Sequence, residues 1–348
     1  MVELWYTILA LMLVGYAVLD GFDLGAGAAH LFVARTDDER RTVLGAIGPF
    51  WDGNEVFLLA AGGVLFVAFP KALAAGLSGF YLAIFLVVWT LLLRGIAIEF
   101  RSHVDDALWR AAWDAVFALA SALLAVLFGV ALANLVRGVP LDADGWFSLA
   151  LFTHFRTEEP VGLLDWYTIL VGVFALATLT AHGACFLAWK TAGAVEARSR
   201  RLALAAFAAV AALWPLVTWA TRVASPGAFA TLGGRPLAWA GAVAAAVGIG
   251  TAFVGLRARR GLVAFLGSCA YVGGLLGATG AILFPVLLRS TADPSRSLTA
   301  FDAASPASGL RTALGWFSVG APLALAYFVT LHRLHRGKVA PPVDGHGY

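Results

Sequence analysis

Residues 115–136 read AVFALASALLAVLFGVALANLV, a run of 22 residues without a single charged side chain. A helix needs roughly 20 consecutive apolar residues to cross the hydrocarbon core of a bilayer. The strands of a membrane β-barrel are shorter and alternate between apolar and polar residues, which this run does not do. The run therefore predicts a transmembrane α-helix.

Similar apolar segments extend from this run toward both ends of the chain. Of the 348 residues, 61% are hydrophobic and 13% charged, and the mean hydropathy is +0.84, which excludes a soluble globular domain and a disordered chain. We predict an all-α, polytopic integral membrane protein that forms one transmembrane domain over residues 1–348. Its nine transmembrane helices are expected at residues 4–33, 54–74, 76–98, 111–137, 162–189, 202–221, 236–256, 262–288 and 310–332.

The distribution of Lys and Arg predicts how the helices are oriented. Fifteen of these residues follow the odd-numbered segments, whereas eight follow the even-numbered ones. Because cytoplasmic loops are enriched in Lys and Arg, we expect the N-terminus outside and the C-terminal tail in the cytoplasm. The net charge of +3 is scattered over the loops, so no nucleic-acid partner is expected.

Two acidic residues lie within the first segment. Asp20 and Asp23 are three residues apart and so share one face of the helix. A charged side chain at the centre of a membrane helix costs about 2.5 to 3.5 kcal/mol, so such acids need a reason to be there. They are either a proton relay along a polar crevice or packing anchors near a helix end. Gly21 and Gly25 form a G-x-x-x-G motif, which lets a second helix approach closely.

A second polar group precedes the second apolar segment, where Trp51, Asp52, Asn54 and Glu55 lie within five residues. Asp52 followed three residues later by Glu55 has the form of a capping box, which predicts that Asp52 caps this helix. The same carboxyl could instead carry protons at the membrane surface. The residues alone leave both interpretations open.

The third segment contains an arginine near its cytoplasmic end. Arg94 either extends its guanidinium toward the surface or pairs with a carboxylate such as Asp114, which we expect to open the fourth helix. Arg94, Asp114 and Glu99 are therefore candidates for structural ion pairs, because a buried arginine without a partner is destabilising.

The histidines and cysteines give no pattern of a metal or haem site. His182 lies in an apolar stretch with Thr178 and is expected to make a hydrogen bond between helices. Cys185 and Cys269 both lie in apolar runs, outside any C-x-x-C motif. We therefore expect that this chain alone binds neither haem nor a metal ion.

Several motifs of the chain, taken together and in order, resemble subunit II of the cytochrome bd quinol oxidases. The motif GPFWDGNEV is the most specific of them, and residues 138–260 carry the resemblance by composition alone. The matching motifs are DGFDLG (20–25), GPFWDGNEV (48–56), SGFY (78–81), RGIAIEFR (94–101), WD (113–114) and SLTAFDAAS (297–305).

The resemblance implies a particular architecture and a partner. Subunit II of that family has two four-helix bundles, expected here at 1–137 and 202–335, with a peripheral helix at 162–189. It forms a heterodimer with a similarly folded subunit I, which carries two b haems and haem d and oxidises quinol while reducing O2 to water. A small single-helix subunit and membrane lipids are further candidate partners. The expected location is the bacterial cytoplasmic membrane.

The resemblance also implies roles for individual residues. Subunit II would support assembly and take part in proton uptake from the cytoplasm, with Asp52 and Trp51 as the first candidates and Asp23 and Asp20 after them. No catalysis is expected from the isolated chain. A secondary transporter or channel is the alternative class, since it too has many helices and sparse intramembrane charge. A third possibility is a scaffold that only stabilises subunit I.

Overall fold

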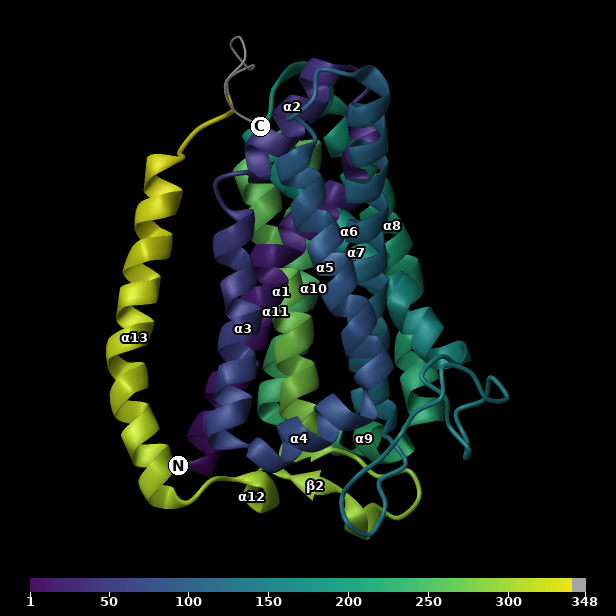
Figure 1. The fold of residues 1–348 in the computed structure, drawn as a ribbon. Helices are drawn as coiled ribbons and strands as arrows, with labels where there is room; N and C mark the ends of the chain where they lie inside the picture. The colour runs from purple at the N-terminus through teal and green to yellow at the C-terminus, as the bar shows by residue number, and fades with distance from the viewer. Residues whose placement is uncertain (340–348) are drawn as a thin grey trace.

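The computed structural model describes residues 1–339, and the last part of the predicted cytoplasmic tail lies outside them. Within this range, nine helices are long and apolar enough to cross a membrane, which confirms the predicted all-α polytopic class. They run up and down between two ends of the molecule (Figure 1). The nine are α1 (Val2–Val33), α3 (Trp51–Ala68), α5 (Tyr81–Phe100), α6 (Ala107–Arg137), α7 (Trp166–Lys190), α8 (Gly193–Ala224), α10 (Pro236–Arg257), α11 (Gly261–Leu283) and α13 (Ala307–Leu334).

Short elements connect these helices at both ends. Helix α2 lies at the end where α1 stops, and a capping box between Thr36 and Glu39 fixes its start. At the opposite end, β1 and β2 pair antiparallel, with Val286 opposite Thr299 and Leu288 opposite Leu298. The short elements are α2 (Asp37–Ile47), α4 (Pro70–Gly79), α9 (Pro226–Thr231), η1 (Leu232–Gly234), β1 (Val286–Leu288), η2 (Pro294–Arg296), β2 (Leu298–Thr299) and α12 (Ala300–Ala303).

Some predicted boundaries shift in the structure. The second span ends at Ala68 and not at 74, because Pro70 lacks a backbone N–H and begins a new helix, α4. The third span therefore starts at Tyr81 and not at 76. The fourth begins at Ala107 with Asp106 as its N-cap, so Asp114 lies two turns inside the helix and does not open it.

The helix expected at the periphery is in fact central. Helix α7, the fifth span, packs against α1, α6, α8 and α11 and is the most buried of the nine spans within the described residues. The ninth span, α13, is the peripheral one and runs along one side of the molecule (Figure 1). Within this chain α7 is therefore not peripheral, because it packs with α1, α6, α8 and α11. The division into bundles at 1–137 and 202–335 stays a prediction.

Glycines explain why α7 lies in the centre. A Cβ on Gly25 of α1 would lie 1.8 Å from the backbone oxygen of Leu179, and one on Gly183 of α7 would lie 2.1 Å from the backbone nitrogen of Ala26. The backbones of α1 and α7 thus touch, which only glycine permits. The G-x-x-x-G motif of α1 predicted a close helix contact, and α7 is the partner it could not identify.

Candidate functional site

A cluster of ionisable side chains lies buried between α1, α3 and α5. Arg94 of α5 donates a hydrogen bond of 2.8 Å to Asp20 of α1 and another to Glu55 of α3. The side-chain nitrogen of Asn54 donates a hydrogen bond of 2.7 Å to Asp23. Asp20, Asp23, Asn54 and Arg94 are all completely buried. We call Asp20, Asp23, Asn54, Glu55 and Arg94 the intramembrane cluster.

Helix geometry brings these residues together. Asp20 and Asp23 are three residues apart on α1, as the sequence predicted, and Asn54 and Glu55 lie in the first two turns of α3. Asp23 and Asp20 precede the end of α1 at Val33 by ten and thirteen residues, about 15 and 20 Å along the helix axis. The cluster therefore lies well inside the span.

The cluster is incompletely hydrogen-bonded. Within the described residues, one carboxylate oxygen each of Asp20 and Asp23 and two nitrogens of Arg94 are buried without a hydrogen-bond partner. The hydroxyl of Tyr16, one turn before Asp20, is in the same state. The open hydrogen-bonding positions therefore lie on both the acidic and the basic side chains of the cluster.

Asp52 lies at the surface end of the cluster. Helix α3 begins at Trp51, its N-cap is Phe50, and no side chain bonds this cap, so the prediction that Asp52 caps the helix was wrong. Asp52 is exposed and Glu55, one turn further along, is 26% exposed. Trp51 packs against α5, since a Cβ on Gly95 would lie 3.4 Å from its ring. From Asp52 through Glu55 to Asp20, the acids thus become progressively more buried.

A second cluster of charges lies where α2, α5 and α6 meet. Asp114 of α6 accepts hydrogen bonds of 2.7 and 3.1 Å from Arg101 and one of 2.8 Å from Arg40. The ring nitrogen Nε2 of His30 lies 2.7 Å from the same carboxylate. Arg101 also donates a bond of 2.6 Å to Asp37. We call Asp114, Arg101, Arg40, His30 and Asp37 the end cluster.

The sequence identified most of these residues but not their pairing. The expected pairing of Arg94 with Asp114 was wrong, because Arg94 bonds Asp20 and Glu55 while Asp114 bonds Arg101. Glu99 lies exposed near the end of α5. The sequence placed Glu55 only in the predicted helix cap. Its position one turn after Asp52 could also have indicated that its carboxyl lies between Asp52 and Arg94.

The buried histidines are engaged in hydrogen bonds. His182 of α7 bonds the hydroxyl of Ser268 at 2.7 Å and the carbonyl of Val18 at 2.8 Å, so it joins three helices as the sequence predicted. His30 belongs to the end cluster. No group of three or more His, Cys, Asp or Glu residues in the described part of the chain could hold a metal ion.

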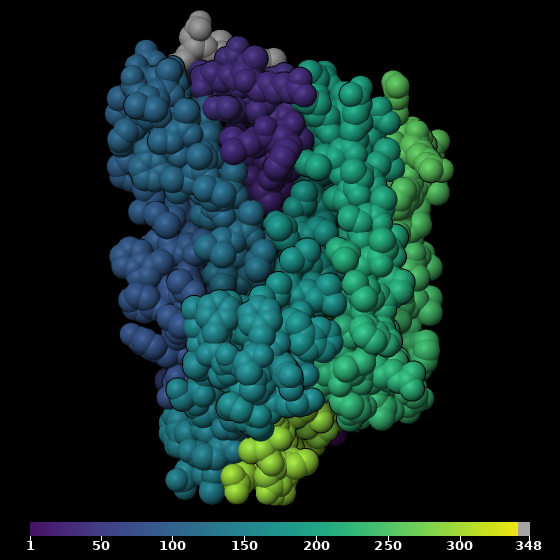
Figure 2. All heavy atoms as spheres, turned by 90° about the vertical axis from the view of Figure 1, so that its right-hand side faces the viewer, coloured from purple at the N-terminus to yellow at the C-terminus, as the bar shows by residue number. Residues whose placement is uncertain are grey.

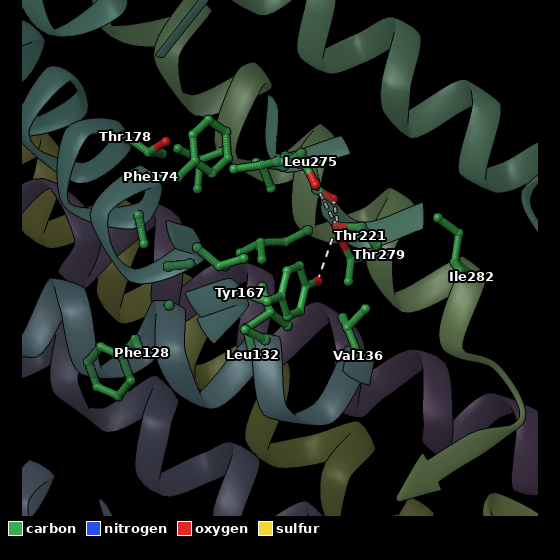
Figure 3. Close-up of a pocket in the computed structure, with 18 of the residues that line it drawn as sticks. Phe128, Leu132, Val136, Tyr167, Phe174, Thr178, Thr221, Leu275, Thr279 and Ile282 are labelled. Atoms are coloured by element: carbon green, nitrogen blue, oxygen red, sulfur yellow. Dashed lines mark hydrogen bonds between the residues drawn. The ribbon is translucent and has the colours of Figure 1, made fainter. Parts of the chain in front are cut away.

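An apolar cavity of about 220 Å³ lies between α6, α7, α8 and α11. Its few polar groups include the hydroxyls of Tyr167 and Thr221, which lie 3.1 Å apart and point toward each other in Figure 3. No carboxyl lines this cavity. It is therefore separate from the intramembrane cluster and offers no path for protons between the acids.

Fold and cluster together define a class of protein, namely polytopic helical membrane proteins that keep ionisable side chains inside the bilayer, where such residues mark ion or proton pathways. Within this class the chain belongs to the cytochrome bd terminal oxidase subunit II family, whose model matches residues 1–335. Membership in this family decides against a secondary transporter or channel. With its nine apolar spans, the chain is a bacterial inner-membrane protein.

Individual relatives agree with this assignment. Subunit 2 of the cytochrome bd-I ubiquinol oxidase of Escherichia coli is 38% identical over 217 residues, which cover 62% of this chain and 55% of the relative. The Bacillus subtilis cytochrome bd ubiquinol oxidase subunit 2 is 37% identical over 58% of this chain and 57% of its own length. A probable cytochrome oxidase subunit 2 of Haemophilus influenzae is 32% identical over 94% of this chain and 92% of the relative.

A solved structure has the same fold. The bd oxidase of Geobacillus thermodenitrificans contains a chain that matches with a TM-score of 0.75, at 19% identity, over 96% of this chain and 98% of that one. The match extends over nearly all the described helices. By contrast, this chain matches only about half the length of the Escherichia coli and Bacillus subtilis relatives.

Proposed function

We propose that this chain is the haem-free subunit of a quinol:O2 oxidoreductase. In this proposal it pairs with a subunit I that holds two b haems and haem d, and it supports the assembly of that subunit. Family membership and the names of the relatives support the proposal.

We further propose that the intramembrane cluster takes up protons for the reduction of O2. The observation that supports this best is the graded burial of the acids, from exposed Asp52 through partly exposed Glu55 to buried Asp20 and Asp23. The positive-inside bias predicts that Asp52 lies at the cytoplasmic side, with the N-terminus outside. A proton from the cytoplasm would then meet Asp52 first and the deeper carboxyls later.

The charge balance of the cluster favours proton storage. Three carboxyls, those of Asp20, Asp23 and Glu55, share a single guanidinium, that of Arg94. Burying three carboxylates against one cation is costly in a low-dielectric environment, so binding a proton would reduce the charge that the cluster buries. Such coupled carboxyls gain and lose protons as a group, which is how a relay passes a proton on.

The test is O2 consumption normalised to haem d in the complex that carries Asp52→Asn, compared with Glu55→Gln. Both changes remove an ionisable proton and almost preserve side-chain size. We expect both to slow turnover per haem d, while haem content persists. The control is Asp38→Asn, which neutralises an exposed acid at the same end of the molecule, on α2, and should leave turnover unchanged.

Three outcomes separate the alternatives. A wild-type rate per haem d in both variants would reject the relay and leave the chain as an assembly scaffold. A loss of haem d in proportion to activity would instead assign these acids to assembly. An unchanged rate in Asp52→Asn with a slowed Glu55→Gln would move the proton entry point to Glu55.

A further inference from the structure

A crevice runs along the outer side of the molecule between α8 and α10. This is the side that Figure 2 faces, and α13 lies away from it, at the opposite edge of Figure 1. The crevice has a volume of about 650 Å³. Its walls are the outer face of α8, which includes Ala211, Trp214, Trp219 and Arg222, together with Phe229 of α9 and Ile249 of α10.

The crevice exists because α8 and α10 each pack more closely on another helix. Helix α8 packs along α7, and α10 packs along α11. Glycines hold α10 against α11, since a Cβ on Gly241, Gly248 or Gly255 would lie 2.7, 2.4 and 2.5 Å from the α11 backbone. Helices α8 and α10 meet only sparsely, and no described side chain fills the space between them.

The crevice ends at an arginine whose charge is not balanced. Arg222 is exposed at the end of α8, and it makes no ion pair with any residue in the described range. The sequence contains no Asp or Glu between Glu196, in the first turn of α8, and Asp293, so the rest of α8 and all of α9, α10 and α11 provide no carboxylate for it. A second cation, Arg289, lies against α9, where its buried Nε has no hydrogen-bond partner among residues 1–339.

We propose that this crevice binds one anionic phospholipid, with its phosphate at Arg222 and an acyl chain between α8 and α10. Ala211 and Arg222 are eleven residues apart, so the crevice runs about 16 Å along the helix, a length suited to an acyl chain and not to a headgroup alone. Trp214 and Trp219 line the same face, and tryptophan prefers the region between headgroups and hydrocarbon. A guanidinium binds phosphate oxygens through two parallel hydrogen bonds.

The charge argues for a lipid and against a protein helix as the occupant. A partner helix would balance Arg222 only if it carried a carboxylate at that one position, whereas every anionic phospholipid carries a phosphate. A phospholipid brings its negative charge to the depth of the headgroups, where Arg222 lies at the end of a span. Arg222 therefore favours a headgroup with a net negative charge over a zwitterionic headgroup, which carries its own cation.

The experiment is native mass spectrometry of the purified complex, delipidated and then titrated separately with phosphatidylglycerol and phosphatidylcholine. We expect one phosphatidylglycerol bound more tightly than phosphatidylcholine. Arg222→Gln should weaken phosphatidylglycerol binding about tenfold, the loss of one charge-assisted contact. The matched control is Arg311→Gln, an exposed arginine at the same end of the molecule but on α13, which should bind as wild type does.

A second variant tests the acyl-chain part of the site. Ile249→Trp should fill the crevice and weaken the binding of both lipids, while Arg222 stays in place. Equal retention of the two lipids by the wild-type complex, or wild-type binding by Arg222→Gln, would overturn the proposal. So would displacement of phosphatidylglycerol by inorganic phosphate alone, or a structure of the complex in which a protein chain covers the crevice.

Discussion

The intramembrane cluster and the end cluster contain similar residues in opposite states. At the end cluster, two arginines and a histidine surround the single buried carboxylate of Asp114, and both of its oxygens accept hydrogen bonds. In the intramembrane cluster, three carboxyls share Arg94, and one oxygen each of Asp20 and Asp23 has no partner within the described residues. The first arrangement surrounds one carboxylate with cations, whereas the second surrounds one cation with carboxyls.

This difference separates a structural role from a functional one. A buried carboxylate such as Asp114, whose two oxygens both accept hydrogen bonds, rigidifies the fold, because protonating it would break some of these bonds. A buried cluster with an excess of carboxyls and open hydrogen-bonding positions can change its protonation state at little structural loss. The comparison therefore predicts different responses to substitution in the two clusters.

The largest effect is expected for Arg94→Gln. Without the guanidinium, two or more buried carboxyls have no cation to balance them, and breaking such a pair destabilises a protein by about 3 to 5 kcal/mol. We expect little assembled complex, measured as haem d in the reduced-minus-oxidised spectrum of membranes. Arg94→Lys retains the charge and should restore part of the yield. A wild-type amount of haem d in Arg94→Gln would show that the cluster does not depend on this charge.

A smaller loss of stability is expected for Asp114→Asn. Hydrogen bonds to charged groups contribute about 1.5 to 3 kcal/mol, and the amide of the introduced asparagine retains only part of those made by Asp114. The loss is limited because Asp37 still balances the charge of Arg101. We expect a lower thermal midpoint of the purified complex and an unchanged O2 consumption per haem d. Slower turnover at wild-type stability would contradict the assignment of the end cluster to structure.

For Asp23→Asn we expect slower turnover at almost unchanged stability, which is the reverse of Asp114→Asn. The side-chain oxygen of the introduced amide can still accept the hydrogen bond from Asn54, so stability should change by less than about 1 kcal/mol. Turnover per haem d should fall by roughly 100-fold if Asp23 passes protons, the lower end of what a positioned proton-transfer group contributes. The measurement is O2 uptake beside a thermal scan of the same preparation. An unchanged rate would remove Asp23 from the proposed path.

The smallest effect is expected for Glu39→Gln at the surface. A hydrogen bond from Arg198, with further bonds from the backbone, lowers the pKa of Glu39 below its ordinary value of 4.5. This contribution to stability is therefore present above pH 4.5 and is lost as the pH falls through the lowered pKa. An exposed pair is screened by water and contributes about 0.2 to 1 kcal/mol.

The measurement is the difference in thermal midpoint between wild type and Glu39→Gln near neutral pH and again in acid. We expect a small difference at neutral pH that disappears in acid. A glutamine side chain preserves the capping box of α2, so the variant removes only the charge. A difference that grows as the pH falls would contradict the sign of this prediction.

The sequence by itself determined which residues enter the membrane. Apolar runs such as 115–136 must form helices in a bilayer because every backbone polar group needs a partner there, so the number and approximate place of the spans follow from composition. Their ends were less certain where a local break such as Pro70 divides a run. The acids at positions 20, 23 and 52 were equally visible, since charge in an apolar stretch is conspicuous.

Tertiary structure alone decided which of these residues meet. The pairing of Arg94 depends on how α1, α3 and α5 are rotated about their axes, and the central place of α7 depends on glycines that match across two helices distant in sequence. A single sequence gives the face of a helix but not the neighbour of that face. Many side chains acting together select the neighbour, because packing energies are individually small and add up only over whole interfaces.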